Sequence, residues 1–133
     1  MDNRFEVTVG AGTMMSGSDV AVRFPHRWTA DGVTVEGDFT GGHLLNLATA
    51  GCVLNDIYRE AATLGIKVSG VRVTAAGGFD TATWQSTGID YSVEVSSDAS
   101  ADKLAHLLEV VDQVAEIPRA IRAGASVRQA SSC

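Results

Sequence analysis

The stretch HLLNLATAGCVLNDIYREAATLG, residues 43–65, decides the fold of this 133-residue chain. Apolar residues occupy almost every face of a helix from Leu44 to Leu54, and the first charge comes only at Asp56. Gly65 closes the stretch as a C-cap glycine would. Because a helix that is apolar all round is buried on all sides, we expect this helix at the centre of the molecule.

The segments on either side of this helix predict strands, because apolar and polar residues alternate in them. The alternation runs through residues 5–9, 20–24 and 33–35 before the helix, and through residues 71–75 and 89–95 after it. Glycine-rich stretches separate the early strands. We therefore expect an antiparallel meander of two or three strands before the helix and two strands after it.

A second, amphipathic helix is predicted beyond the last strand, with Ser100 as its N-cap. Its apolar stripe has helical spacing and consists of Leu104, Leu107, Leu108, Val111 and Val114. Pro118 stops or kinks this helix. A short turn through residue 121 and a last strand at residues 125–129 follow in the prediction. The order of elements predicts one α+β domain over residues 1–133.

One thin sheet covers only one side of a helix that is apolar on every face. The simplest way to bury the other side is a second copy of the chain, and so we expect a homodimer. The alternative is a helix wrapped entirely by the sheet of its own chain.

The composition excludes several classes of partner. The net charge is -6, and the ten Lys and Arg residues form no run, so we expect no nucleic-acid partner. The apolar stretch is far shorter than the roughly 20 residues of a membrane span, so we expect no membrane partner. Two cysteines, Cys52 and Cys133, are too few for a disulfide framework, and no signal-peptide pattern is present. These features predict a cytoplasmic protein with reduced thiols.

Cys52 is the residue best suited to chemistry, although its surroundings argue both ways. Burial among apolar residues raises the pKa of a thiol, and Asp56, one helical turn away, raises it further. From these residues alone, an inert structural cysteine is the simpler interpretation. The three histidines, His26, His43 and His106, lack the spacing of metal ligands, and no cofactor-binding motif is present. We therefore expect neither a metal nor a cofactor.

The segment from Gly42 to Cys52 resembles the signature helix of the OsmC/Ohr family, the osmotically inducible and organic hydroperoxide resistance proteins. The order of elements from Thr40 to Gln129 follows the same family. The resemblance implies an intertwined homodimer with the cysteine helices at its centre and an active site at the subunit interface. It also implies a cysteine that reduces hydroperoxides, a second cysteine that resolves its sulfenic acid, and an arginine and a glutamate that stabilise the thiolate.

Only part of this machinery has a counterpart in the chain. Cys52 falls on the peroxide-reacting cysteine, whereas the glutamate position falls on Gly42 and the resolving-cysteine position on Ala115. The resemblance allows either Arg23 or Arg27 as the stabilising arginine.

Cys133, the last residue, follows two serines in the C-terminal tail and has two interpretations. It replaces the missing resolving thiol, or it is a free terminal thiol without a role. The sequence therefore leaves two functions open for the whole protein. One is a peroxide-stress protein that reduces organic hydroperoxides through Cys52 alone, at a dimer interface, with an external thiol as reductant. The other is a non-catalytic dimer that binds a small apolar ligand or a protein partner.

Overall fold

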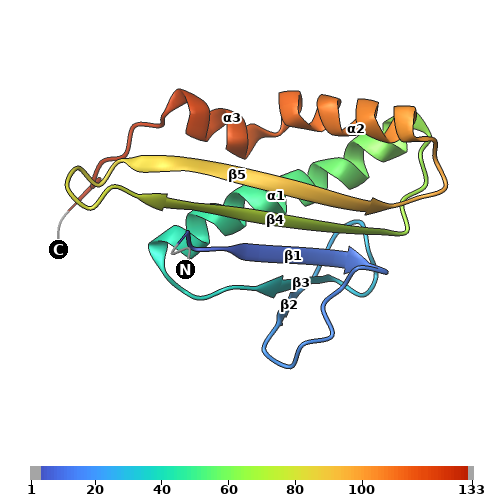
Figure 1. The fold of residues 1–133 in the computed structure, drawn as a ribbon, viewed down its shortest axis with the longest axis horizontal. Coiled ribbons are helices and arrows are strands. Elements are labelled where there is room, and N and C mark those ends of the chain that lie inside the picture. The colour runs from blue at the N-terminus through green and yellow to red at the C-terminus, as the bar shows by residue number, and fades with distance from the viewer. Residues whose placement is uncertain (1–3, 132–133) are drawn as a thin grey trace.

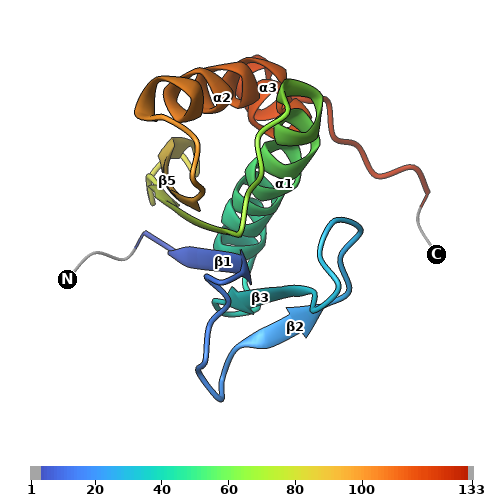
Figure 2. The ribbon, with the colours of Figure 1, turned by 90° about the vertical axis from the view of Figure 1, so that its right-hand side faces the viewer.

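The computed structural model describes residues 4–131, and it has one antiparallel sheet of five strands in the order β2-β3-β1-β4-β5. Helix α1 crosses one face of the sheet, and α2 and α3 pack against α1 beside β5 (Figures 1 and 2). The elements in chain order are β1 (Val7–Gly12), β2 (Val22–Phe24), β3 (Val33–Glu36), α1 (Gly41–Leu64), β4 (Gly70–Phe79), β5 (Ser86–Ser96), α2 (Ala101–Val114) and α3 (Glu116–Ala123). The α+β class predicted from the sequence is confirmed.

The strand order differs from a simple meander, because β1 does not pair with β2. Strand β3 lies between them and is antiparallel to both, with Val9 opposite Val35 and Val22 also opposite Val35. The connection over residues 13–21 is long enough for β2 to lie one strand away from β1, and β3 fills the position between them. Strand β1 then pairs with β4, with Val9 opposite Val73, and joins the two halves of the sheet.

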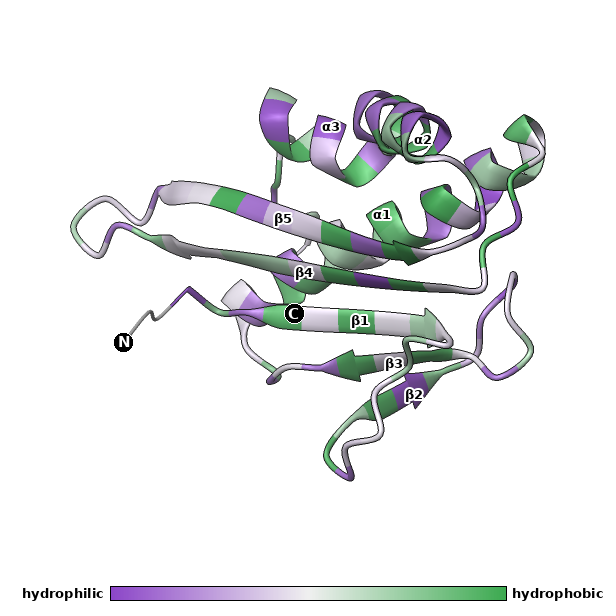
Figure 3. Cartoon of the chain, turned by 45° about the vertical axis from the view of Figure 1, so that its right-hand side comes forward, coloured by the Kyte–Doolittle hydropathy of each residue, from purple (hydrophilic) through white to green (hydrophobic). Residues whose placement is uncertain are grey.

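The core lies between the sheet and α1. The inward residues of β1 and β4 are fully or almost fully buried, and they are Val7, Val9, Ala11, Val71, Val73 and Ala75. The other face of the sheet carries polar groups, such as the ion pair in which Arg72 Nη1 lies 2.8 Å from Glu94 Oε2. The same alternation is visible as green and purple bands along β4 and β5 in Figure 3. The predicted period of two in these strands is confirmed.

Local signals fix both ends of α1. The hydroxyl of Thr40, the N-cap, accepts a hydrogen bond of 3.2 Å from the backbone N–H of His43. At the other end Gly65 adopts the left-handed conformation, with φ 71°, and Ile66 N–H donates to the Ala61 carbonyl oxygen at 2.9 Å. This is the C-cap that the sequence predicts.

The sheet of the chain does not wrap α1 completely. Leu44 is 38% exposed, Ala48 is exposed, and a Cβ added at Gly51 would meet open space. The interpretation in which one chain buries its own helix on all sides is therefore wrong. Within residues 4–131, α1 included, no helix combines the length and the apolar character that crossing a membrane requires.

The chain after α2 differs from the prediction. Helix α2 starts at its Ser100 cap and stops before Pro118, as expected. The predicted turn through residue 121 is instead part of helix α3. Pro118 lies in the first turn of α3, and the helix tolerates it there because backbone N–H groups in a first turn have no partner within the helix. The predicted strand at residues 125–129 is wrong, because residues 124–131 form neither helix nor strand.

A buried amide ties the N-terminal segment to α1 and β4. Asn46 is almost fully buried, and its Nδ2 donates to the Phe5 carbonyl oxygen at 2.8 Å. The same nitrogen lies 3.2 Å from the Arg4 carbonyl oxygen and 3.3 Å from that of Gly77. These carbonyl groups lie where regular strand pairing ends, so Asn46 supplies the hydrogen bonds that the sheet does not.

Replacing Asn46 with Leu should therefore lower the free energy of unfolding by about 1–3 kcal/mol, since buried carbonyl oxygens lose their donor. Urea denaturation followed by circular dichroism measures the change. Thr63→Val, at an exposed position of the same helix, is the control and should shift the midpoint very little. Equal midpoints for the two variants would contradict this role of Asn46.

Candidate functional site

Cys52 lies in the wall of a cavity of about 430 Å³ between α1, the β2-β3-β1 side of the sheet and the start of α3. The lining is mostly apolar, and it includes Val9, Phe24, Val35, Leu47, Leu54 and Ile117. Cys52 itself is 8% exposed. A nucleophilic group therefore lies at the surface of a cavity whose shape and polarity suit a small apolar molecule.

The N-terminus of α3 borders the Cys52 cavity, because Glu116 and Ile117 belong to its lining. The backbone N–H group of Ile117, the second residue of α3, lowers the pKa of the Cys52 thiol. A helix N-terminus carries a partial positive charge, which favours a thiolate. Helix α3 thus supplies part of the positive potential that a reactive cysteine needs.

Burial and two carboxylates act in the opposite direction. Burial is the largest influence on Cys52 and raises the pKa of its thiol, and Asp56 and Glu116 raise this pKa further. A carboxylate oxygen of Glu116 lies within 4.8 Å of the Cys52 sulfur. The net pKa of Cys52 is raised, so the thiol is protonated at neutral pH.

Asp56 is the most deeply buried acid of the site, with its side chain 3% exposed. Burial raises the pKa of its carboxyl group, and Arg59 partly offsets this effect. Arg59 Nη2 lies 3.1 Å from Asp56 Oδ2, which is an ion-pair distance. The approach is poorly directed, however, and Asp56 Oδ2 accepts no well-formed hydrogen bond. The negative charge of the Asp56 carboxylate is therefore only partly compensated by Arg59.

His26 closes another side of the cavity. Its Nε2 lies 2.9 Å from Asn55 Oδ1 and its Nδ1 lies 2.7 Å from Thr29 Oγ1. The imidazole ring also packs against the rings of Trp28 and Tyr58. These contacts fasten the loop after β2 to α1 and hold the apolar wall of the cavity in place.

The structure does not bring the two candidate arginines to Cys52 within one chain. Arg23 lies on β2, and the guanidinium carbon of Arg27 lies 5.9 Å from the ring centroid of Trp28. Neither side chain lines the cavity. Cys133 lies outside the described residues.

The positions that lack the expected glutamate and second cysteine are both tightly packed. A Cβ added at Gly42 would lie 2.5 Å from Cγ of Phe5, whose ring also makes an edge contact with His43. Ala115 is fully buried at the junction of α2 and α3. The local packing thus leaves little room for a longer side chain at either position.

Glu116, His26 and Asn55 belong to this site, but reasoning from the sequence did not select them. His26 and Asn55 are adjacent only because the loop after β2 folds onto α1. Glu116 reaches Cys52 only because α3 begins there, and the sequence predicts a turn in its place. An acidic residue two positions before a proline is a typical helix start, and this signal identifies Glu116 as a first-turn residue.

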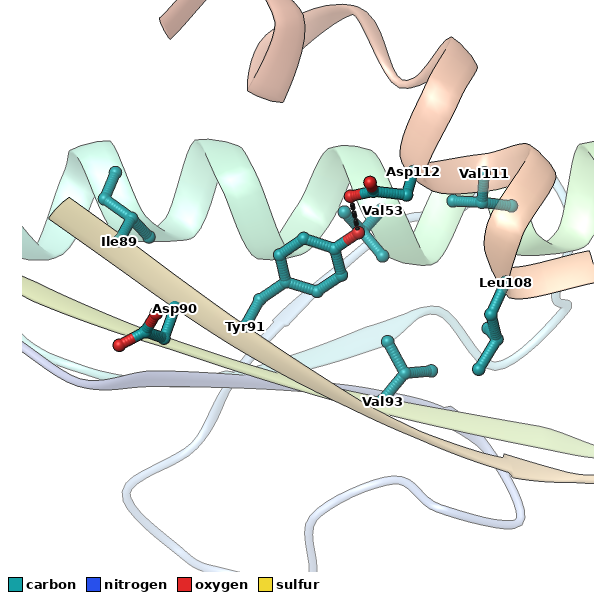
Figure 4. A pocket seen from close by; sticks show the side chains of 8 residues that line it. All are labelled: Val53, Ile89, Asp90, Tyr91, Val93, Leu108, Val111 and Asp112. Atoms are coloured by element: carbon teal, nitrogen blue, oxygen red, sulfur yellow. Dashed lines mark hydrogen bonds between the residues drawn. The ribbon is translucent and has the colours of Figure 1, made fainter. Parts of the chain in front are cut away.

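A second cavity, of about 460 Å³, lies between β5, α1 and α2 (Figure 4). Its wall is largely apolar, and its main polar contact is the hydrogen bond from the Tyr91 hydroxyl to Asp112 Oδ1. Arg122 Nη2 also lies 2.9 Å from this oxygen. Burial raises the pKa of Tyr91, and its hydrogen bond lowers the pKa of Asp112. Since these groups satisfy one another and no thiol or imidazole lines the cavity, the Cys52 cavity is the better candidate site.

Comparison with known proteins points to one family. The family model described as OsmC-like protein matches residues 34–129. A crystal structure of an OsmC-like hydroperoxide resistance protein from Jannaschia sp. CCS1 superimposes with a TM-score of 0.53 and 11% sequence identity. The superposition covers 95% of this chain and 93% of that one. At this identity the likeness shows a shared fold. No curated protein sequence matches the chain.

The carboxylates around Cys52 lead to a test of its acidity. Glu116→Gln removes a negative charge beside the sulfur, so the apparent pKa of the Cys52 thiol should fall. The measurement is the rate of alkylation by iodoacetamide as a function of pH, followed by mass spectrometry in a Cys133→Ser background.

Glu109→Gln, an exposed residue of α2, is the matched control and should leave this pKa unchanged. In the parent protein the apparent pKa should lie above about 8.5, the value of an unperturbed thiol. A lower value, or no fall in Glu116→Gln, would show that the carboxylates do not govern the thiol.

Proposed function

Because this chain belongs to the OsmC-like protein family, we propose that it is a peroxide-stress protein that reduces organic hydroperoxides through Cys52. The observation that carries the proposal is the position of the Cys52 thiol, in the wall of an apolar cavity and at the N-terminus of α3. In this arrangement one cysteine meets an apolar substrate, and one helix stabilises its thiolate.

The lining of the cavity defines the class of substrate. Phe24, Leu47 and Ile117 offer apolar contacts to an organic group, whereas hydrogen peroxide has no group to fill this space. Burial of apolar surface contributes about 25 cal/mol for each Å² removed from water. An organic hydroperoxide should therefore bind more tightly than hydrogen peroxide.

The first step forms a bond between the Cys52 sulfur and the terminal oxygen of the hydroperoxide, while the O–O bond breaks. Glu116 takes the thiol proton and passes it to the departing alkoxide, so the products are an alcohol and the sulfenic acid of Cys52. One molecule of external thiol then releases water and forms a mixed disulfide. A second molecule restores Cys52 and leaves the reductant as its disulfide.

The proposed protein is a homodimer in which the open face of α1 is covered by a second copy. Leu44 and Ala48 of α1 are exposed, Gly51 is half-buried, and Phe24 at the edge of the sheet is also exposed. Arg23 or Arg27 would act on Cys52 across this interface, because neither lines the cavity of its own chain. The cytoplasmic location and the external thiol reductant also remain predictions.

A second function is favoured by the surroundings of Cys52, since its burial and the carboxylates of Asp56 and Glu116 raise the pKa of its thiol. A protonated thiol is a poor nucleophile, and an apolar cavity suits a bound ligand equally well. In this alternative the dimer binds a small apolar molecule or a protein partner without catalysis. Ligand binding would then be unchanged in Cys52→Ala.

Peroxide consumption separates the two functions. With an external thiol present, the parent protein should consume cumene hydroperoxide faster than hydrogen peroxide, and Cys52→Ser should be inactive. The rate should increase as the pH rises toward the raised pKa of Cys52, because the thiolate is the reacting form. Cys133→Ser should retain the activity if one cysteine is sufficient.

Arg23→Ala and Arg27→Ala, assayed alongside, identify the arginine that acts across the interface through a loss of kcat/KM. Negligible rates for the parent protein and Cys52→Ser alike would refute the reductase and leave the binding function.

The dimer has its own test. Leu44→Glu places a charge on the open face of α1, and charge at the centre of an apolar interface opposes association. Light scattering with size-exclusion chromatography should give twice the 13.9 kDa chain mass for the parent protein and a lower mass for the variant. Ala105→Glu, at an exposed position of α2, is the control. A parent protein that elutes as a single chain would contradict the dimer.

A further inference from the structure

Two carboxylates and one thiol converge beside the Cys52 cavity, and two of these side chains, Cys52 and Glu116, line it. One donor atom each from Cys52, Asp56 and Glu116 lies within 4.8 Å of the other two. Ligands of a tetrahedral zinc ion, with bonds of about 2.0–2.3 Å, lie roughly 3.5 Å apart. The three atoms, which lie within 4.8 Å of one another, are therefore close to the spacing that coordination requires.

This cluster lacks sufficient positive charge in the single chain. Asp56 is almost fully buried, and its Oδ2 is a buried oxygen without a well-formed hydrogen bond. Arg59 Nη2 lies 3.1 Å away, but this side chain is 43% exposed and its Nε is bonded to Glu60. Placing a buried carboxylate beside a second carboxylate and a thiol is costly unless a cation compensates.

We propose that Cys52, Asp56 and Glu116 form a binding site for a divalent cation of the zinc class, with a fourth position open toward the apolar cavity. The sulfur ligand favours a zinc-like ion over magnesium or calcium, which prefer oxygen ligands alone. Three protein ligands and one open position are also the arrangement of zinc sites that accept a water molecule or a small ligand.

The proposed site differs from the sequence-based expectation of no metal. The sequence does not predict it because its ligands come from elements that are far apart along the chain. Cys52 and Asp56 share one face of α1, but Glu116 comes from α3, far along the chain. No spacing rule within a single helix or hairpin connects these residues. Only the packing of α3 against α1 assembles them.

The site has a regulatory consequence, which rests on the proposed hydroperoxide reduction. A metal ion that holds the Cys52 sulfur displaces its proton and occupies the lone pair that would attack a peroxide. Zinc and hydroperoxide should then compete for Cys52. The binding of the metal does not depend on that activity and is tested without it.

Cobalt(II) is the probe, because a cobalt–thiolate bond gives a charge-transfer absorption that reports sulfur ligation directly. Metal-free, full-length protein in a Cys133→Ser background should show this absorption at one equivalent of cobalt, and Cys52→Ser should not. Glu116→Gln should weaken cobalt affinity at least about 100-fold, since loss of even an outer-shell partner costs 10–100-fold. Glu109→Gln, the matched exposed control, should bind as the parent does.

Zinc should also raise the Tm of the parent protein and leave that of Glu116→Gln unchanged. Because Glu116 is exposed, this variant tests the site without disturbing the core. Absence of the charge-transfer absorption, or equal affinity in Glu116→Gln and Glu109→Gln, would overturn the proposal.

Peroxide consumption by metal-free protein is measured separately. If that activity is absent while the cobalt spectrum appears, the proposed reductase fails and the metal site stands. If activity is present, one equivalent of zinc should abolish it in the parent protein.

Discussion

Burial of α1 against β1 and β4 is the interaction on which the rest of the structure depends. Each fully buried valine, leucine or isoleucine contributes about 1.5–3 kcal/mol relative to an exposed position. Val53, Leu54 and Ile57 of α1 are all buried in the core, and they lie within two turns of Cys52. The residues that stabilise the fold thus also hold Cys52 and Asp56 in a poorly hydrated position, and this position sets the acidity of both groups.

Local patterns in the sequence predict the elements of the fold better than their arrangement. Thr40 and Gly65 mark the ends of α1, and the alternation in β5 follows from its contact with helices on one side and water on the other. The place of β3 between β1 and β2 has no local signal, because it depends on which edge of β1 remains free. Helix α3 is missed because Pro118 is read as a stop, whereas a proline in the first turn starts a helix as readily.

In the candidate site, too, the sequence predicts the residue that has a local signal and not those that packing brings to it. Cys52 is predicted from its helix and from the resemblance of that helix to the family. Glu116 and His26 enter the site through packing between distant segments, which a single sequence does not reveal. The resemblance directs attention to an arginine and a glutamate, but within one chain the groups around the sulfur are two carboxylates and the N-terminus of a helix. The chemistry of the site therefore has to be derived from its own geometry.

The packing of Phe5 over Gly42 also restricts how this protein can change over evolutionary time. Phe5 adopts a left-handed backbone conformation, with φ 52°, and its ring contacts both His43 and Phe79. A single substitution of Gly42 by glutamate meets this ring and overpacks the junction. Position 5 has to change first, and that change removes the two ring contacts. Positions 5 and 42 are thus coupled, because a side chain at position 42 fits only where the residue at position 5 is smaller.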